Sequence, residues 1–168
     1  MWAARTFAGV ALLGLLAAGA MGQSASPLKD QLIGTWLQVI TEVTAPDGKK
    51  SFPFGETPNG ILIFTPDGRF AQIHIAGDVP KFGSSNRLMG TLEEYKAVGQ
   101  KSLSLFGTYT VDEANKTVTF KVLSSTFPNM AGESQVRTIE ILTADEFKNS
   151  TIVAGGRGSA FNLYKRAK

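Results

Sequence analysis

The sequence predicts an all-β protein: an eight-stranded antiparallel up-and-down β-barrel with one short helix between the third and fourth strands. Apolar and polar residues alternate with a period of two along most of the chain from Gly34 onward, as in strands that bury one face. Turn residues separate these segments at regular intervals. Eight strands can close around one small ligand, and closure removes the unpaired edges of an open sheet.

The expected strands are short and are bounded by turns rich in Pro, Gly, Asn and Asp. The clearest pair is a hairpin at Pro66-Asp67-Gly68, where proline restricts φ and glycine permits a positive φ. In the first strand, Trp36, Gln38 and Ile40 are expected to share one face. The eight strands are expected at residues 35–43, 61–65, 69–76, 105–111, 117–123, 134–142, 150–153 and 159–165.

The one helix expected within the barrel domain covers residues 92–98, where the alternation of the strands stops. Thr91 is suited to cap its N-terminus, and Glu93 and Glu94 stand in its first turn, where the helix dipole favours negative charge. A shorter turn of helix is expected at residues 28–31, leading the chain into the first strand.

Residues 1–22 have the pattern of an export signal, and we expect a secreted or periplasmic protein. Arg5 precedes an apolar run over residues 7–20, which ends in the small residues around Ala20 and Gly22. A membrane anchor is the alternative, but a span takes roughly 20 strongly apolar residues and this run is shorter. We expect cleavage before Gln23, with a cut before Met21 as the second choice.

The remaining chain is expected to be one domain, with a linker and helical turn at residues 23–33 and the barrel at residues 34–168. The absence of cysteine excludes a disulfide scaffold, thiol chemistry and a lipid-anchored lipoprotein. We expect no stable membrane insertion after cleavage. The sequence leaves the oligomeric state open.

The charge of the chain does not favour nucleic acid as a partner. The formal net charge is +3 and the sequence pI about 9.2, but the basic residues are scattered. The one cluster is Lys165, Arg166 and Lys168 at the end of the chain, and no basic stripe alternates with aromatic residues.

Two segments at opposite ends of the barrel domain resemble the lipocalins. Gly34-Thr35-Trp36, after a helical turn, is similar to the Gly-any-Trp motif that opens the first lipocalin strand. Tyr164-Lys165-Arg166 is similar to the lipocalin C-terminus, where a late Arg or Lys packs over that Trp. A cation over an indole ring contributes about 0.5–2 kcal/mol. The resemblance therefore implies that Gly34, Trp36 and Arg166 close one end of the barrel.

Further segments are similar to the bacterial and fungal lipocalin-like domain family. The resemblance implies a lipocalin or calycin type of β-barrel that holds a small molecule, and some relatives of this type are cyclases or isomerases. The chain has Thr119-Phe120-Lys121 where relatives often carry a histidine, so no histidine role is carried over. The similar segments are Pro53-Phe54-Gly55, Pro58-Asn59-Gly60, Phe64-Thr65-Pro66-Asp67-Gly68, Glu94-Tyr95, Phe106-Gly107-Thr108-Tyr109, Pro128-Asn129, Gly132, Gln135 and Arg137.

His74, the only histidine, is a candidate ligand-binding residue. It shares a strand face with Phe70 and Gln72, while Ile73 and Ile75 occupy the other face. If the isoleucine face packs outward, His74 points into the barrel as a polar anchor or a proton carrier. The alternative is a histidine that faces solvent.

Arg137 is a second candidate, because its alternation places it on one face with Ile139 and Ile141. An inward guanidinium can bind a ligand carboxylate or phenolate through two hydrogen bonds. The alternative is neutralisation by a structural partner near Glu140 or by Asp145.

Three aromatic residues complete the candidate ligand-binding set. Tyr109 and Tyr95 can donate hydrogen bonds to a ligand, and Phe120 can line its pocket; the alternative for each is a place in the core.

No catalytic residue, metal site or cofactor is expected. The chain has one histidine, no cysteine and no carboxylate cluster at ligand spacing. Gly155-Gly156-Arg157-Gly158 lacks the strand-to-helix setting of a phosphate loop, and no nucleophile elbow occurs. The leading hypothesis is an exported protein that binds a small hydrophobic molecule in the barrel. The alternatives are an isomerase or cyclase acting on a small polyketide- or lipid-like substrate, and a structural envelope protein with a filled barrel.

Overall fold

The computed structural model describes residues 26–152 and 158–168. The expected export signal at residues 1–22, the first residues of the linker and the glycine-rich segment around Arg157 lie outside the described residues.

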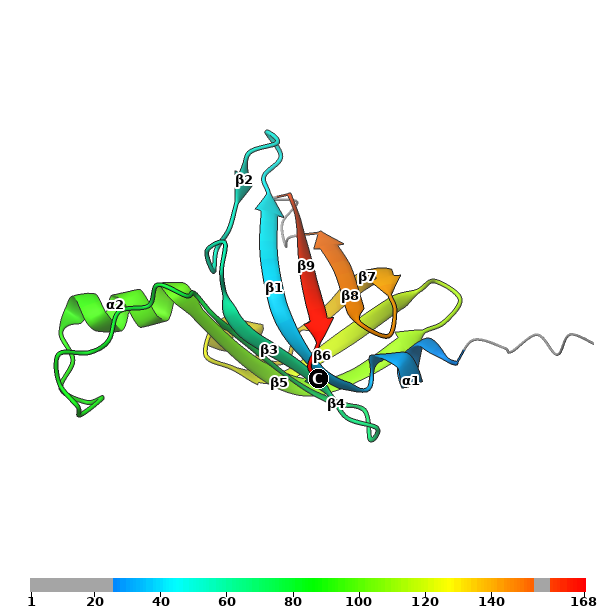
Figure 1. Ribbon diagram of the computed structural model, residues 1–168, viewed down its shortest axis with the longest axis horizontal. Coiled ribbons are helices and arrows are strands. Elements are labelled where there is room, and N and C mark those ends of the chain that lie inside the picture. Colours follow the sequence, from blue (N-terminus) through cyan, green and yellow to red (C-terminus); the bar gives the residue numbers. More distant parts are fainter. Residues whose placement is uncertain (1–25, 153–157) are drawn as a thin grey trace, which may run out of the picture.

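Eight antiparallel strands form one closed barrel (Figure 1). Each strand pairs with the next along the chain, and the last pairs with the first. This arrangement confirms the predicted eight-stranded up-and-down barrel. The strands are β1 (Gly34–Thr44), β3 (Asn59–Phe64), β4 (Arg69–Ile75), β5 (Ser102–Asp112), β6 (Thr117–Ser125), β7 (Ser134–Leu142), β8 (Glu146–Ile152) and β9 (Ser159–Arg166).

The predicted place of the helix, between the third and fourth strands, is wrong. Helix α2 (Leu92–Lys101) lies between β4 and β5, because a two-residue strand β2 (Lys50–Ser51) pairs with the end of β1. A strand of two polar residues is too short to show alternation, so it cannot be recognised in the sequence. A second helix, α1 (Leu28–Leu32), precedes β1, and a 3₁₀ turn, η1 (Pro128–Met130), follows β6.

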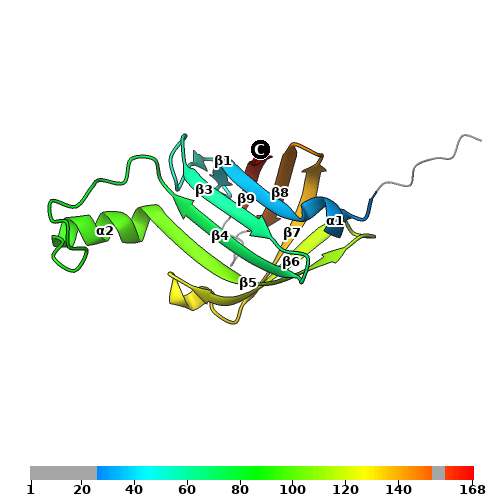
Figure 2. The same ribbon diagram turned by 60° about the horizontal axis from the view of Figure 1, so that its bottom comes forward.

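The two α-helices lie at opposite ends of the barrel. In both views α2 projects beyond the ends of β4 and β5, whereas α1 lies at the other end (Figures 1 and 2). Thr91 and Glu94 form the N-terminal capping box of α2, each side chain accepting from the other residue's backbone N–H. The helix itself has no buried residue.

Two β-bulges change which side chains face the interior. The pairing of β1 with β9 shifts register between Gln38 and Ile40, so Thr41, not Ile40, follows Gln38 on the inner face. The pairing of β7 with β8 shifts between Ile139 and Ile141, and Ile141 is 38% exposed. The faces predicted for Ile40 and Ile141 are therefore wrong, because strict alternation does not survive an extra residue.

Strand β8 begins at Glu146, earlier than the predicted start at residue 150. Phe147 and Asn149 are buried within it, and Glu146 and Lys148 are half-buried. A buried asparagine between polar neighbours resembles a turn in the sequence, which is why the strand was predicted too short.

Arg166 closes the end of the barrel beside α1. Its guanidinium carbon lies 4.0 Å from the centre of the Trp36 ring, as the resemblance implied. The guanidinium donates hydrogen bonds to the backbone carbonyls of Gln31 at 2.6 Å, Ile33 at 2.9 Å and Ala144 at 2.5 Å. One side chain thus ties the segment before β1 to the turn before β8.

Gly34 is required at this end for steric reasons. Its φ is +127°, a conformation that residues with a Cβ rarely adopt. A Cβ built there would lie 2.8 Å from Nη1 of Arg166. Any larger residue would therefore push the guanidinium off Trp36.

The half of the barrel next to Arg166 is filled by aromatic side chains. Phe64 contacts Tyr109, Phe120 and Phe147 with ring centres 4.8, 5.7 and 6.1 Å apart. Trp36 contacts Phe147 at 5.6 Å, and its indole N–H donates to the backbone carbonyl of Leu32. This aromatic plug leaves space for a ligand only in the opposite half.

We expect Arg166→Met to lower the free energy of unfolding by about 1–3 kcal/mol, because it removes the contact with Trp36 and leaves backbone carbonyls without their donor. Lys165→Met is the matched control, since Lys165 is the exposed neighbour. Urea unfolding of both variants measures the difference. Equal losses in the two variants would contradict the closing role of Arg166.

Candidate ligand-binding site

A cavity of about 910 Å³ occupies the half of the barrel opposite Arg166. It is bordered by the end of β1, the end of β4, the start of β5, the start of β7, the end of β8 and the start of β9. Segments between strands contribute Pro53, Phe54 and Met130. The wall is mostly apolar, and its apolar members include Val43, Phe54, Leu103, Met130 and Ala160.

Between this cavity and the aromatic plug lies a set of buried polar side chains that we call the polar layer. Its members come from β1, β4, β7, β8 and β9, and each is less than 9% exposed. Because buried polar groups are stable only when hydrogen-bonded, the layer should be connected internally. The polar layer consists of Gln38, Thr41, Gln72, His74, Arg137, Asn149, Asn162 and Tyr164.

One part of the polar layer runs from His74 to Asn162. Nδ1 of His74 lies 2.9 Å from Oε1 of Gln38, whose amide nitrogen donates to Thr41 at 2.8 Å. Thr41 in turn donates to Oδ1 of Asn162 at 2.7 Å. Since Gln38 uses its nitrogen as a donor, its oxygen accepts, and Nδ1 of His74 is the donor of a neutral imidazole ring.

The other part of the polar layer is centred on Arg137. The amide of Asn162 donates to Oδ1 of Asn149 at 3.3 Å, and Nη1 of Arg137 approaches the same oxygen at 3.5 Å. Nη2 of Arg137 approaches Oε1 of Gln72 at 3.5 Å, and Gln72 donates to the hydroxyl of Tyr164 at 2.7 Å. The layer is therefore a continuous hydrogen-bonded path across the barrel.

Arg137 is 7% exposed and lines the cavity. Its shortest hydrogen bond goes to Oε1 of Gln135, at 2.9 Å from Nη2, and its guanidinium carbon lies 4.8 Å from the centre of the Phe120 ring. Burial lowers the pKa of this guanidinium from its ordinary value. The acceptors of its three hydrogen bonds are neutral amide oxygens, and the hydroxyl of Tyr164 lies close enough to raise its pKa in part.

The structural carboxylate partner considered for Arg137 is not found. Glu140 points to the outer face and pairs with Lys148 at 2.9 Å. Asp145 is exposed in the turn before β8. In residues 26–152 and 158–168, none of the ion pairs includes Arg137.

His74 points into the barrel, which is the first of the two orientations that the alternation of β4 leaves open. It is 4% exposed, whereas Ile73 and Ile75 on the outer face are each 37% exposed. Its ring stacks on Phe54 with centres 4.5 Å apart. Burial, and secondarily the charge of Arg137, lower the pKa of His74 from 6.5 to about 3.

The structure separates the predicted aromatic residues. Phe120 is fully buried beneath Arg137. Tyr109 belongs to the aromatic plug, and its hydroxyl donates to the backbone carbonyl of Thr65 at 3.0 Å. Tyr95 lies on α2, outside the barrel, where its hydroxyl donates to the backbone carbonyl of Arg87. Phe120, like Tyr109, belongs to the aromatic plug, so of the five predicted ligand-binding residues only His74 and Arg137 line the cavity.

Sequence reasoning missed most of the polar layer. Gln38 and Gln72 were placed on the correct faces, beside Trp36 and His74, but no role was assigned to them. Asn149 and Asn162 pair directly across β8 and β9. The signal that could have found them is a polar residue at an inward position of an alternating strand.

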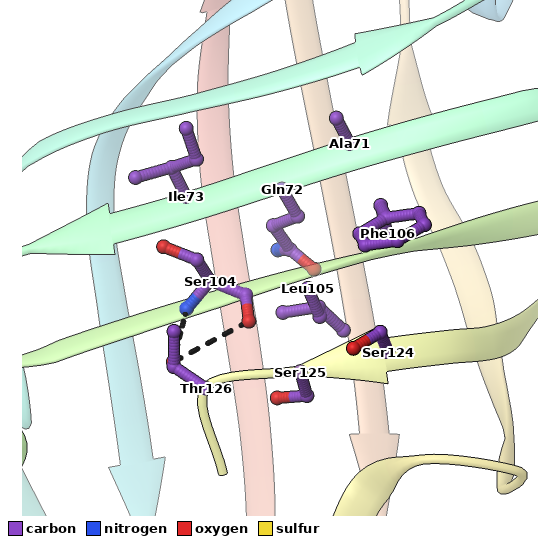
Figure 3. Close-up of a pocket in the computed structure, with 9 residues that line it drawn as sticks. All are labelled: Ala71, Gln72, Ile73, Ser104, Leu105, Phe106, Ser124, Ser125 and Thr126. Atoms are coloured by element: carbon purple, nitrogen blue, oxygen red, sulfur yellow. Dashed lines mark hydrogen bonds between the residues drawn. The ribbon is translucent and has the colours of Figure 1, made fainter. Parts of the chain in front are cut away.

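A second, smaller cavity of about 330 Å³ lies over β4, β5 and β6 (Figure 3). Exposed or half-buried side chains such as Ile73 and Phe106 line it, together with Ser104, whose backbone N–H donates to Thr126. Gln72 is the polar-layer residue that reaches it. Because no charged side chain lines this cavity, the larger one is the stronger candidate site.

Among the described residues, no group of three or more His, Asp or Glu side chains is arranged to hold a metal ion. In the same residues, no helix has both the length and the apolar character needed to cross a membrane.

A model of the lipocalin-like domain family matches residues 33–160 of the sequence. The chain belongs to the lipocalin-like domain family. This confirms the family indicated by Gly34-Thr35-Trp36 and the segments that follow it. The match begins one residue before β1 and ends at the second residue of β9, so it covers all of the first strand and only the start of the last.

Three solved structures to which this lipocalin-like domain has weak similarity are designed barrels. A redesigned β-barrel is 16% identical, with a TM-score of 0.43 and coverage of 84% of this chain and 96% of that one. A de novo designed fluorescence-activating β-barrel is 13% identical, with a TM-score of 0.46 and coverage of 85% and 100%. A redesigned β-barrel bound to DFHBI is 15% identical, with a TM-score of 0.41 and coverage of 84% and 100%. These values are too low to bear on function. No curated protein matches the sequence significantly.

The low pKa of His74 makes the stability of the lipocalin-like domain depend on pH. The folded protein keeps His74 neutral down to about pH 3, whereas in the unfolded chain the ring takes up a proton near pH 6.5. The unfolded chain therefore binds more protons between these values, and stability falls as the pH drops below 6.5.

We expect the free energy of unfolding of the native protein to fall with acid more steeply than that of His74→Gln, by up to about 1.4 kcal/mol per pH unit. The variant keeps a side-chain donor for Gln38 but does not titrate. Urea unfolding at several pH values between about 4.5 and about 7.5 measures both slopes. Parallel profiles would show that His74 is not held neutral by the fold.

Proposed function

We propose that this protein is an exported carrier that binds a small hydrophobic molecule in the cavity of about 910 Å³. The cavity itself is the observation that supports the proposal, because its volume falls within the range of roughly 300–1,000 Å³ typical of small-molecule sites. Its mostly apolar wall above a few convergent polar groups also has the composition of such sites.

The apolar wall provides the driving force for binding. A ligand that buries about 300 Å² of apolar surface gains roughly 7 kcal/mol before the costs of association. Those costs amount to several kcal/mol, so the wall alone supports weak to moderate affinity. A preformed site reduces them, and the hydrogen-bonded polar layer holds the cavity floor in one arrangement.

The cavity favours this proposal over a structural protein with a filled barrel. In a filled barrel, aromatic side chains like those of the plug would occupy both halves, and no space large enough for a ligand would remain. The isomerase or cyclase alternative has less support, because a histidine whose pKa is about 3 takes up protons poorly at neutral pH.

Blocking the cavity should abolish binding without unfolding the protein. We expect Leu103→Trp, which fills space at the wall, to weaken binding of the neutral probe N-phenyl-1-naphthylamine at least tenfold. Leu123→Trp is the matched control, because Leu123 is 52% exposed and does not line the cavity. Fluorescence titration measures binding, and thermal unfolding confirms that both variants fold.

Mass spectrometry of lipophilic extracts from protein purified from its native host complements this titration. A retained apolar molecule supports the carrier. If the native protein binds no probe and retains no molecule, the carrier proposal fails.

Export rests on the pattern of residues 1–22, with a basic residue, an apolar run and small residues before Gln23. We expect Leu13→Arg, which interrupts the apolar run, to keep the protein in the cytoplasm. Ser26→Arg, which adds the same charge beyond the signal, should leave export intact. Cell fractionation and the intact mass of the exported form check this; an exported form that retains residue 1 would contradict cleavage.

A further inference from the structure

The polar layer contains two buried donors without an acceptor. Within the described residues, Nε of Arg137 and Nδ2 of Asn149 form no hydrogen bond, although neither atom is accessible. Buried donors are rarely left unpaired, because each has lost its water without gaining a protein partner. Nη1 of Arg137 contacts Oδ1 of Asn149, so the two unpaired donors belong to neighbouring side chains of the polar layer.

The charge of Arg137 is also uncompensated. Its side-chain neighbours are Gln72, Gln135, Asn149, the ring of Phe120 and the hydroxyl of Tyr164. The amides and the ring carry no charge, and burial raises the pKa of Tyr164, which keeps its hydroxyl neutral at neutral pH. No Asp or Glu is among the described residues that line the cavity. A buried cation is costly unless it is paired, so an anion bound in the cavity would stabilise Arg137.

The hydrogen bonds that hold the guanidinium leave it free to accept a new partner. Two of its three contacts are 3.5 Å long, at the outer limit of hydrogen bonding, and only the bond to Gln135 is short. A carboxylate that approached from the cavity could replace the long contacts. The donors of a guanidinium match the two oxygens of a carboxylate in one plane.

Resting on the carrier function proposed above, we infer that the ligand is an amphiphilic organic acid whose carboxylate binds Arg137 and whose apolar body extends toward the mouth of the barrel. The carboxylate supplies the missing charge and accepts from Nη1 and Nη2 of Arg137, in place of their 3.5 Å contacts with Asn149 and Gln72. The apolar body lies against Val43, Phe54 and Leu103. The neutral His74 at the same level adds no competing charge.

The test compares an acid with its uncharged analogues of the same length. Dodecanoic acid, dodecan-1-ol and methyl dodecanoate are each titrated into the protein without its export signal, loaded with N-phenyl-1-naphthylamine, at neutral pH. Displacement of the probe measures the affinity of each compound. We expect the acid to bind at least tenfold more tightly than the alcohol or the ester, because only the acid carries a charge that pairs with Arg137.

Two variants test whether the preference for the acid depends on residues of the polar layer. Arg137→Gln should reduce the acid-to-alcohol ratio to near one. Asn149→Asp should also reduce the acid-to-alcohol ratio to near one, because its carboxylate would pair with the guanidinium in place of the carboxylate of the ligand. Arg69→Gln is the control: Arg69 is exposed and pairs with Asp67 on the surface, so its loss should leave the ratio unchanged.

A spectroscopic measurement on the native protein avoids dependence on variant folding. The carboxyl ¹³C shift of labelled dodecanoic acid reports its ionisation, and beside Arg137 the bound acid should stay ionised at lower pH than the free acid. Equal binding of acid and alcohol, or a bound acid that titrates like the free one, overturns the inference while the carrier function stands. If neither the acid nor the alcohol nor the probe binds, the carrier function itself fails.

Discussion

The pairing of β1 with β9 is the constraint on which the rest of the structure depends. It joins the first and last strands of the domain over most of their length, from Trp36 opposite Arg166 to Thr44 opposite Ser159. Without it the sheet would be open, with two unpaired edges and no enclosed interior. The cation of Arg166 over the indole of Trp36 lies at the first step of this pairing, so the same side chains close the barrel and seal its end.

The closed barrel is divided into two halves with different roles. Aromatic rings fill the half near Arg166, where dense packing stabilises the fold. The other half keeps a cavity of about 910 Å³, and the polar layer separates the two. Burying so many polar groups is tolerable because they hydrogen-bond to one another across five strands. The exceptions, at Arg137 and Asn149, are therefore informative about what the cavity holds.

Buried Arg137, which forms no ion pair among the described residues, shapes the electrostatics of the barrel interior around it. It contributes to the low pKa of His74, since a positive charge nearby disfavours protonation of the ring. In the carrier that we propose, it also gives the mostly apolar cavity one charged group that selects among ligands. Apolar contact alone discriminates weakly between ligands of similar size, whereas a desolvated charge discriminates strongly between an acid and a neutral analogue.

The sequence by itself determined the barrel, the family and the closing residues Gly34, Trp36 and Arg166, because these follow from local alternation and from short motifs. It also grouped His74 with Gln72 and Arg137 with Ile139 on common strand faces, since a regular strand alternates, but it left open which way the face of His74 points. Only the tertiary structure decided the inner faces beyond the two bulges, where Thr41 replaces Ile40 and Ile141 turns outward. It alone assembled the polar layer, because hydrogen bonds such as that from Thr41 to Asn162 join residues far apart in the chain through strand register. The exclusion of Tyr95 from the interior was likewise decided by the path of α2, which carries it away from the barrel.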